Sequence, residues 1–342
     1  MSSTSSGSKR GGPAGVVLLQ LGGPEKLADV RPFLNNFFVD LIPDNIPVPK
    51  PAVRPLAFLF SSLRAPYSRR LYASIGGGSP LRNQTELQAQ ALRSELAQRA
   101  IDARVYVAMR NWRPDSAEAV ERAQADGVER MVALPLYPQY SFSTTRSSVN
   151  ELRRVLASRA YAPQLTVVDE YCEDPKYISA MVSLIRRYLA AFQAPANRVH
   201  LVFSAHGLPV KYVQRGDPYF DQVLRTMAAI NERLDHPGPV HLSFQSRLGP
   251  EKWLGPASDA LIARLGKDGA SAVCVVPIAF VSEHVETLNE IDILYASVAK
   301  KHRIAEFRRV CAVKSHPDFI ACLADHVERA LEGERRPTEA LR

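Results

Sequence analysis

The chain has 342 residues, 46% of them apolar and 23% charged, a balance that is typical of a globular protein and excludes a disordered or fibrous one. Its formal net charge of +8 favours an anionic partner such as anionic lipid or a carboxylated or phosphorylated substrate, and no nucleic-acid-binding motif is present. No run of about 18 apolar residues occurs, so no membrane-spanning helix is expected.

The two ends of the chain are expected to be disordered tails. Residues 1–14 are small, polar and basic and lack the apolar core of a secretory signal, and residues 332–342 follow the last apolar pattern. None of the four cysteines lies in a C-x₂-C pair, so a disulfide framework or a zinc site is disfavoured, and reduced thiols and a cytoplasmic location are expected. These cysteines are Cys172, Cys274, Cys311 and Cys322.

Strand-like and helix-like patterns alternate along almost the whole chain. Short apolar runs predict strands, and apolar residues that recur every three to four positions predict helices. The expected strands are 15–21, 104–109, 131–136, 165–170, 198–204, 240–245, 272–279 and 305–311. The expected helices are 84–100, 116–126, 146–158, 175–191 (capped by Asp174), 218–234, 256–265, 284–299 and 318–331.

This alternation indicates an α/β protein with parallel sheets. Eight strands could close into one barrel. Irregular helix lengths and loops favour two open, doubly wound halves of four strands each, divided near residues 160–175.

A segment at about 40–80 interrupts the alternation. It is rich in proline and carries an apolar run at 56–60, followed by Arg64, Arg69 and Arg70. An apolar patch beside clustered arginines is typical of contact with an anionic lipid surface. A buried helix with a solvated basic edge explains the segment too, and the residues alone favour this second interpretation.

Two loops directly follow expected strands. Leu21-Gly22-Gly23-Pro24 lacks the spacing of a nucleotide-binding motif, so a tight turn that lets a ligand approach closely is favoured over a phosphate site. The stretch 134–145 contains Tyr137 and Tyr140 among several hydroxyl residues. A capping turn explains its hydroxyls but not its tyrosines, which suit the wall of a pocket.

Histidines follow two other expected strands. His206 lies in Ser204-Ala205-His206-Gly207-Leu208-Pro209, and His284 lies in the segment 282–290. The carboxyl ends of strands are where open α/β sheets bind ligands. An isolated histidine is more often structural, but this position supports a functional interpretation of His206 as well.

Three carboxylates accompany His284. Glu283, Glu286 and Glu290 have the spacing i, i+3 and i+7, which predicts that they line one helix face. A solvated face is the plain interpretation, yet like charges at this spacing repel one another. Crowding raises carboxyl pKa values, which suits proton acceptance near neutral pH. An imidazole that faces a row of carboxylates suits the handling of a divalent metal and of protons.

Taken together, these stretches resemble the ferrochelatases, enzymes that insert ferrous iron into a porphyrin to make haem. The resemblance extends over about residues 15–331. The motifs that carry it are Leu21-Gly22-Gly23-Pro24, Gly76-Gly77-Gly78-Ser79-Pro80, Tyr137-Pro138-Gln139-Tyr140-Ser141, Ser204-Ala205-His206-Gly207-Leu208-Pro209, Arg215-Gly216-Asp217-Pro218-Tyr219, Gln245-Ser246-Arg247-Leu248-Gly249-Pro250, Trp253-Leu254-Gly255-Pro256 and the helix 283–292.

The resemblance implies two Rossmann-like domains, each a four-stranded parallel sheet flanked by helices, around a porphyrin cleft. On this chain the domains would span residues 15–165, with a lip insertion at 40–80, and residues 166–315. The final helix, 316–331, would pack back on the first domain. The implied substrates are protoporphyrin IX and Fe²⁺, and the implied product is protohaem.

The resemblance also implies roles for individual residues. His206 and Glu286 would be the opposed catalytic and metal-handling residues, with proton acceptance and metal delivery both open for His206. The path for protons or metal would include Glu283, His284 and Glu290. The residues that would contact porphyrin are Arg64, Tyr72, Ser79, Arg110, Tyr137 and Trp253.

The chain departs from the family pattern in two places. Phe142 stands where some members have a cysteine ligand of a [2Fe–2S] cluster, and their cysteine-bearing C-terminal extension does not follow, so neither a cluster nor another permanent cofactor is expected. Asn111 stands after Arg110 where an aromatic residue is common. In the family context residues 56–70 resemble a lip that meets the membrane, so peripheral contact with the inner membrane becomes favoured over plain burial.

Several alternatives stay open from the sequence. The enzyme could prefer coproporphyrin, or could insert another metal into another tetrapyrrole. A non-catalytic tetrapyrrole carrier would share the fold without needing His206 opposite Glu286. A zinc hydrolase is disfavoured because no H-E-x-x-H spacing is present. The oligomeric state, monomer or dimer, is left open.

Overall fold

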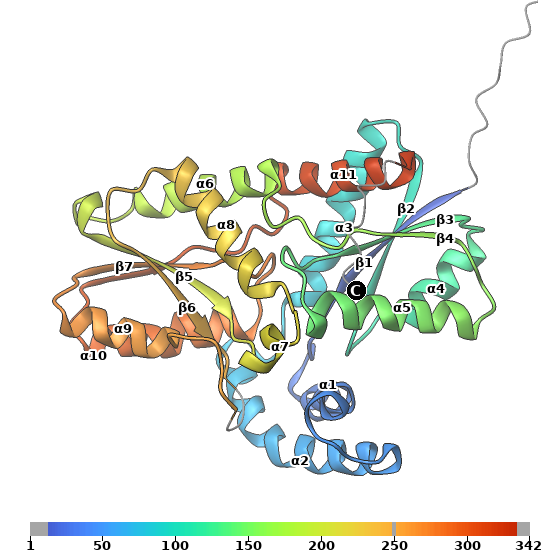
Figure 1. Cartoon of the computed structure of the whole chain (residues 1–342), viewed down its shortest axis with the longest axis horizontal. Helices are drawn as coiled ribbons and strands as arrows, with labels where there is room; N and C mark the ends of the chain where they lie inside the picture. Colours follow the sequence, from blue (N-terminus) through green and yellow to red (C-terminus); the bar gives the residue numbers. More distant parts are fainter. Residues whose placement is uncertain (1–12, 248–250, 334–342) are drawn as a thin grey trace, which may run out of the picture.

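The computed structural model describes residues 13–247 and 251–333, and the expected tails lie almost wholly outside them. It contains two four-stranded sheets in which every pair of neighbouring strands is parallel. The first has the order β2-β1-β3-β4 and the second β6-β5-β7-β8 (Figure 1). The strands are β1 Ala14–Gln20, β2 Ala103–Met109, β3 Arg130–Pro135, β4 Gln164–Val167, β5 Val199–His206, β6 Val240–Gln245, β7 Ala272–Pro277 and β8 Glu306–Arg309. The predicted fold class is confirmed.

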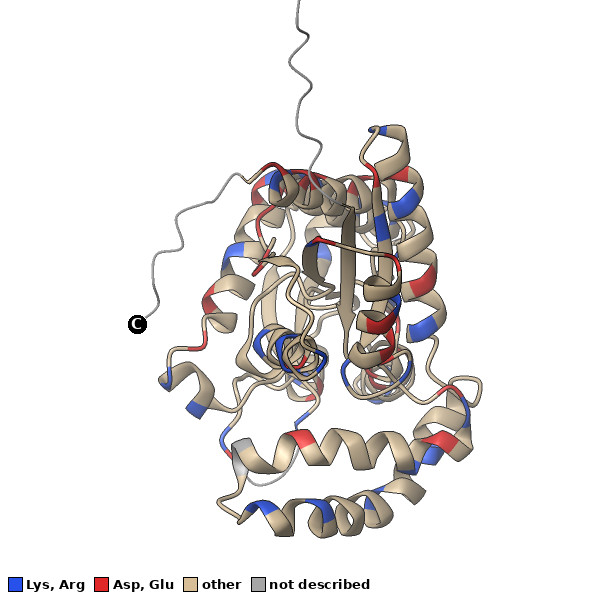
Figure 2. Ribbon diagram, turned by 90° about the vertical axis from the view of Figure 1, so that its right-hand side faces the viewer, with Lys and Arg blue, Asp and Glu red and all other residues tan. Residues whose placement is uncertain are grey.

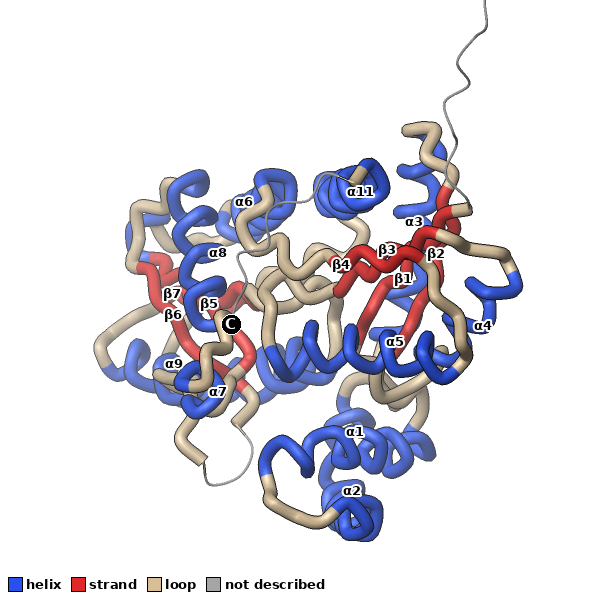
Figure 3. The backbone as a smooth tube through the Cα atoms, turned by 45° about the vertical axis from the view of Figure 1, so that its right-hand side comes forward, coloured by secondary structure: helices blue, strands red, loops and turns tan. Residues whose placement is uncertain are grey.

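Helices cover both faces of each sheet, as parallel sheets require (Figure 3). They are α3 Leu81–Gln98, α4 Ser116–Ala125, α5 Ser147–Ser158, α6 Pro175–Leu189, α7 Val210–Gln214, α8 Tyr219–Leu234, α9 Ser258–Lys267, α10 Ala296–Lys301 and α11 Pro317–Glu332, with short 3₁₀ turns at Leu27–Asp29 and Ala196–Arg198. The predicted cap of α6 is present, because Asp174 Oδ1 accepts a hydrogen bond from the Lys176 N–H at 2.9 Å.

One hydrophobic core runs through both halves of the molecule. It joins Val16 and Leu18 of β1, Phe203 of β5 and Phe319 of α11 through α6. The last helix, α11, lies against α3 of the first half and α6 (Figure 1). Because this core is continuous, the domain boundary expected at 165/166 stays a prediction.

Two expected α-helices begin instead as π-helices. The helix expected at 284–299 is the π-helix η4 (Glu286–Tyr295) followed by α10, and α5 is preceded by the π-helix η2 (Phe142–Arg146). Wider i→i+5 turns are rare, occur often at functional sites, and leave no periodic signal that distinguishes them from α-helix in a sequence. The expected strands 165–170 and 305–311 are also shorter than predicted, as β4 and β8.

The insertion expected at 40–80 is a pair of helices that begins earlier than predicted. These are α1 (Val30–Asn45) and α2 (Lys50–Ser74), which lie beneath the two sheets (Figure 3). Pro43, Pro55 and Pro66 stay inside the helices. Each proline removes one backbone hydrogen bond, and packing between α1 and α2 offsets that loss.

One face of α2 is buried and the opposite face is exposed. The buried face contains Ala57, Ser61, Ala65, Ser68 and Tyr72. The opposite face exposes 58% of Phe58, 49% of Leu59, 71% of Leu63 and 46% of Tyr67. The helix carries lysine and arginine but no aspartate or glutamate, as Figure 2 shows. None of the helices that the structure describes is long and apolar enough to cross a membrane.

Candidate active site

The candidate site lies at the carboxyl edge of the second sheet. In this sheet β6 and β7 pair with opposite sides of β5, so the strand order reverses at β5. This topological switch point is where doubly wound sheets bind ligands, because the connections leave in opposite directions and open a crevice there. His206 ends β5, Ser246 follows β6, and the segment 278–290 follows β7.

His206 and Glu286 are in direct contact. His206 Nδ1 and Glu286 Oε2 are 2.7 Å apart, although the two residues are separated by 80 positions in the sequence. Both residues are partly buried, and 41% of the His206 side chain and 22% of the Glu286 side chain remain accessible. A paired group that is still accessible can reach a substrate, which a fully buried structural pair cannot.

Contact between the two residues shifts both pKa values in the direction that favours the charged form of each side chain. Burial lowers the pKa of the His206 imidazole, but the charge and hydrogen bond of Glu286 outweigh it, and this pKa lies above its ordinary value. Burial likewise raises the pKa of Glu286, but His206 outweighs it, and this pKa lies well below its ordinary value. The Glu286 carboxylate therefore stabilises the imidazolium that forms when His206 accepts a proton.

The backbone around His206 is fixed from several sides. Tyr219 Oη donates to the His206 carbonyl at 3.0 Å, and the Gly207 N–H donates to the Gln245 carbonyl at 2.7 Å. A Cβ at Gly207 would lie 2.5 Å from that carbonyl oxygen and 3.2 Å from the Trp253 ring. Only glycine fits there, so the turn after β5 holds the imidazole in place.

Glu290 lies beside this pair in a different electrostatic state. Burial first, and then the charge of Glu286, raise the pKa of Glu290 to about 7. Ser246 Oγ donates to Glu290 Oε2 at 2.8 Å, and Tyr295 Oη lies 3.4 Å from the same oxygen. The prediction that crowding raises carboxyl pKa values is confirmed for Glu290 and wrong for Glu286, because His206 compensates the charge of Glu286.

Glu283 does not share a helix face with the other two carboxylates, so that prediction is wrong. It precedes η4, and only 4% of its side chain is exposed. Its oxygens accept hydrogen bonds from Arg309 Nη1 at 2.8 Å, Thr287 Oγ1 at 2.7 Å and the Ala312 N–H at 3.0 Å. Burial raises its pKa, but Arg309 and these donors outweigh it and hold the pKa below its ordinary value. A place for Glu283 on a proton or metal path stays a prediction.

His284 is neutral and only partly satisfied. Its Nδ1 accepts the Glu286 N–H at 3.0 Å, which assigns the ring proton to Nε2. That Nε2 is buried and has no hydrogen-bond partner in the described part of the chain. Burial lowers the pKa of His284, and Phe280 packs edge-on at 4.2 Å between ring centroids. A buried donor without a partner is costly and is characteristic of a functional site.

Two of the expected porphyrin contacts adjoin the catalytic pair. Tyr72, at the end of α2, is 6% exposed, and burial and the Glu286 charge both raise the pKa of its hydroxyl. Trp253 packs on Gly207, and its buried Nε1 has no partner among the described residues. Asn289 Nδ2 donates to Ser74 Oγ at 2.7 Å, so the end of α2 is tied to η4.

The other expected contacts belong to the first half or to the surface of α2. Arg110 forms an ion pair with Asp40, and its Nε donates to Ser147 Oγ at 3.0 Å. Tyr137 Oη lies 3.4 Å from Ser148 Oγ. The Ser79 N–H donates to the Pro24 carbonyl at 2.7 Å, so the two glycine motifs meet. The Arg64 guanidinium lies 4.2 Å from the centre of the Tyr67 ring.

Several residues at the site were not predicted individually. Ser246 and Phe280 each follow a strand at the same sheet edge as His206, and this edge was the signal that could have identified them. Ser246 also has a positive φ of 63°, a conformation that costs free energy for a residue other than glycine. Arg309, which binds Glu283, is 26 residues away and left no local signal.

The chain is similar in sequence to proteins of one family. Residues 13–331 match the Ferrochelatase family. A protein named ferrochelatase from Prochlorococcus marinus (strain MIT 9211) is 46% identical over 327 residues, which cover 93% of this chain and 83% of that protein. A protein of the same name from Synechococcus sp. (strain JA-3-3Ab) is 48% identical over 317 residues, which cover 91% of each chain.

Solved structures share the fold at much lower identity. SirB from Bacillus subtilis with Fe³⁺ aligns with a TM-score of 0.55 and 14% identity, covering 94% of this chain and 98% of that one. DR2241 from Deinococcus radiodurans, a multi-domain protein with structural similarity to chelatases, aligns with a TM-score of 0.53 and 13% identity, covering 95% of this chain and 56% of that one. At this identity the likeness concerns the fold alone.

Proposed function

The chain belongs to the ferrochelatase family, and from that premise we propose that it inserts Fe²⁺ into protoporphyrin IX and releases two protons to form protohaem. Family membership makes it a metal-inserting enzyme of haem synthesis, with a porphyrin and iron as substrates. The choice of porphyrin and the role of each side chain are the proposed parts. The observation that carries them is the 2.7 Å contact between His206 and Glu286 at the switch point of the second sheet.

The reaction needs a base beside the porphyrin. A free-base porphyrin holds two pyrrole N–H groups where the metal must bind. Each N–H bond must break, leaving its electron pair on nitrogen to bind Fe²⁺, while the proton passes to the protein. We assign the first acceptance to His206, whose Nδ1 is engaged by Glu286 and whose Nε2 is left for the substrate. The Glu286 carboxylate stabilises the imidazolium that forms.

Glu290 is assigned the next step of proton transfer. Its pKa of about 7 means that it accepts and releases protons at neutral pH with little change in free energy. Ionised Glu290 and Glu286 would repel each other. Glu290 is therefore a favourable acceptor for the proton that the His206 imidazolium releases. Ser246 holds the carboxyl group in place for this transfer.

The His206–Glu286 pair can also bind Fe²⁺ transiently. One imidazole nitrogen and one carboxylate oxygen are ligands that Fe²⁺ accepts, but two ligands do not hold it permanently. A weak site is appropriate because the iron is a substrate that must move on to the porphyrin nitrogens.

Anaerobic insertion of Fe²⁺, and of Zn²⁺ in parallel, into protoporphyrin IX tests this proposal by absorbance. We expect turnover by the unsubstituted protein and its collapse in His206→Ala and Glu286→Ala, with porphyrin binding retained by fluorescence. Turnover of coproporphyrin III alone would move the substrate to that porphyrin. Binding of both porphyrins without turnover of either would support a carrier, and no binding at all would overturn the whole assignment.

We propose further that the exposed face of α2 contacts an anionic bilayer surface, which would make this a cytoplasmic protein peripheral to the inner membrane. Phe58, Leu59 and Leu63 are exposed on a helix whose charged side chains are all cationic. Leu63→Glu should weaken co-sedimentation with vesicles that contain anionic lipid by about tenfold or more. The matched control is Leu87→Glu on α3, where 49% of the leucine is exposed. Equal loss in both variants would contradict this proposal.

We also propose that the enzyme holds no [2Fe–2S] cluster. Position 142 is phenylalanine, and the four cysteines belong to separate parts of the fold: Cys172 precedes α6, Cys274 is in β7, Cys311 follows β8 and Cys322 is in α11. Analysis of iron and acid-labile sulfide in anaerobically purified protein tests this point. Two irons and two sulfides per chain would contradict it.

A further inference from the structure

A second group of metal-binding side chains lies away from the candidate active site. Asp174 caps the start of α6, and Cys322 and His326 are one turn apart on α11. One ligand atom from each of the three residues lies within 4.8 Å of those of the other two. Residues at i and i+4 on one helix face are a frequent source of two metal ligands, and the third comes here from a different helix.

Polar atoms in this group lack partners. His326 Nε2 lies 3.2 Å from Asp174 Oδ2, but it is buried and makes no hydrogen bond of acceptable geometry in the described part of the chain. The hydroxyl of Tyr171, a residue that is 2% exposed, is also buried without a partner. The Tyr171 ring lies 5.8 Å from that of His326. A bound ion is one explanation for buried polar atoms without partners.

From this geometry we infer that Asp174, Cys322 and His326 form a resident transition-metal site that joins α11 to the start of α6. One thiolate, one imidazole and one carboxylate are the donors that Zn²⁺ prefers, and the fourth position is left for water. On binding, the Cys322 thiol loses its proton to solvent and forms a metal–sulfur bond. The three ligand atoms now lie within 4.8 Å of one another. Binding requires them to move to the distances of a tetrahedral metal site.

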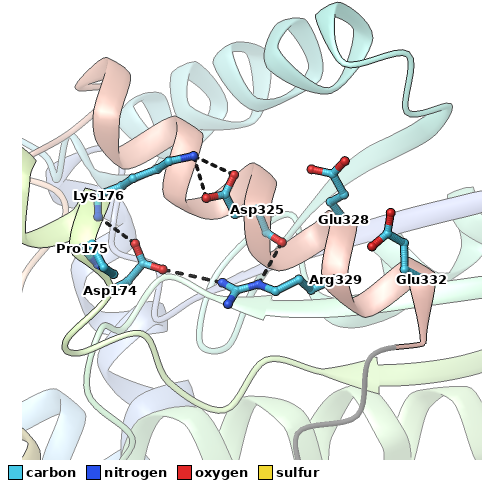
Figure 4. A pocket seen from close by; sticks show the side chains of 7 residues that line it. All are labelled: Asp174, Pro175, Lys176, Asp325, Glu328, Arg329 and Glu332. Atoms are coloured by element: carbon cyan, nitrogen blue, oxygen red, sulfur yellow. Dashed lines mark hydrogen bonds and ion pairs between the residues drawn. The ribbon is translucent and has the colours of Figure 1, made fainter.

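An open hollow borders this group at Asp174. It has a volume of about 430 Å³ and runs along α11 from Asp174 toward the carboxylates of Glu328 and Glu332 (Figure 4). Cations also face it: Lys176 pairs with Asp325, and Arg329 lies 3.6 Å from Asp174 Oδ2. The competing interpretation is an ion pair between protonated His326 and Asp174, which needs neither the thiol nor a metal.

The site was missed in the sequence because the ligands are 148 and 4 residues apart and match no spacing motif. The expectation that the chain has no zinc site rested on that spacing, whereas the expectation of no permanent cofactor rested on the departures from the family pattern. The inference revises it from the three-dimensional arrangement, and it does not depend on which porphyrin the enzyme uses.

Titration of the metal-free, full-length protein with Co²⁺ tests the inference, because a cobalt–thiolate bond produces a charge-transfer absorption band. All proteins carry His206→Ala, which removes the histidine of the other candidate metal-binding pair. We expect one Co²⁺ per chain with a thiolate band, displaced by Zn²⁺. Cys322→Ser should abolish the band, and His326→Gln should weaken Co²⁺ binding by about 100-fold or more.

Cys311→Ser is the matched control, because Cys311 is a half-buried free thiol outside the group. It should keep the band and the stoichiometry. Absence of a thiolate band, or its survival in Cys322→Ser, would overturn the inference. If the substituted proteins failed to fold, the band in the folded Cys311→Ser protein would still decide between a metal–thiolate site and a plain ion pair.

Discussion

The two sheets have the same strand order, but the carboxyl edges at their switch points carry different chemistry. The edge of the first sheet has glycines at 22 and 23, a tyrosine bonded to Ser148, and Arg110 in an ion pair with Asp40. The edge of the second sheet has His206 in contact with Glu286 and beside a carboxyl group whose pKa is about 7. The same topology therefore carries hydrogen-bonded and ion-paired polar groups at the first edge. At the second edge it carries groups with shifted pKa values.

The difference lies in how each polar group is compensated. Arg110 on the first edge has a carboxylate and a hydroxyl as partners. On the second edge His206 compensates Glu286 directly, whereas for Glu290 burial and the repulsion of Glu286 outweigh the Ser246 hydroxyl and the more distant charge of His206. Sheet topology places a side chain at the ligand-binding edge. Neighbouring charges then decide whether it can exchange protons near neutral pH.

The largest expected effect contrasts the two edges directly. His206→Ala removes the proposed proton acceptor and should lower kcat/KM for metal insertion by roughly 100- to 10,000-fold. Tyr137→Phe, on the first edge, removes one long hydrogen bond and should lower it by less than about fivefold. Steady-state assays of both variants measure this contrast. Equal losses would mean that the two edges contribute alike.

The next prediction compares how much Glu283 and Glu290 of the second edge each contribute to the free energy of unfolding. Glu283→Gln leaves the Arg309 guanidinium, which is 9% exposed, without the charge of one of its two carboxylate partners. We expect the free energy of unfolding to fall by about 3 kcal/mol. Glu290→Gln should not lower it at neutral pH, because Glu290 is held in a site that disfavours its charge. Denaturant unfolding at neutral pH measures both, and a large loss for Glu290→Gln alone would reverse the assignment.

Much of this fold could be predicted from the sequence because its signals are local. The apolar runs of β1, β5 and β7 and the Asp174-Pro175 start of α6 are visible in short windows. The carboxyl-edge rule then placed both His206 and His284 at ligand-binding ends of strands without a structure.

The parts that were missed depend on contacts between distant segments. The π-helix η4 separates Glu283 from the face that carries Glu286 and Glu290, and its turn type has no sequence period of its own. Arg309 decides the ionisation of Glu283 from another element. The proline-rich segment interrupted the alternating pattern and its helix bounds were not predicted, whereas packing on α1 keeps α2 continuous through its prolines. In each case tertiary packing overrides a local preference.

A smaller effect concerns the pH dependence of activity. In the unsubstituted enzyme kcat/KM should rise with pH through about 7 as Glu290 ionises and becomes able to accept a proton. Glu290→Gln should remove this part of the rise and lower kcat/KM above that pH by about tenfold. Any rise that is left belongs to His206, whose pKa also lies above its ordinary value. An unchanged profile would exclude Glu290 from the proton path.

The same carboxyl group should affect stability in the opposite direction. Its pKa is raised from 4.5 when unfolded to about 7 when folded, so its favourable contribution is complete below 4.5 and is lost as pH rises through 7. Relative to Glu290→Gln, the unsubstituted protein should therefore lose stability across this window, by at most about 1.4 kcal/mol per pH unit. Activity rises where stability falls, which separates a titration in the folded site from general unfolding.

The smallest expected effect concerns the contribution of the Ser246 hydrogen bond to the pKa of Glu290. Ser246 Oγ donates to Glu290 Oε2 at 2.8 Å and stabilises its charged form, so Ser246→Ala should raise the pKa of Glu290 further, by about one unit or less. The midpoint of the pH profile of kcat/KM should move upward by the same amount, and activity should recover at higher pH. Ser243→Ala is the matched control, because Ser243 is a buried serine of β6 that bonds to Ser258 and not to Glu290. A loss of activity that higher pH does not restore would mean that Ser246 supports the backbone of the site, through its strained φ of 63°, rather than the ionisation of Glu290.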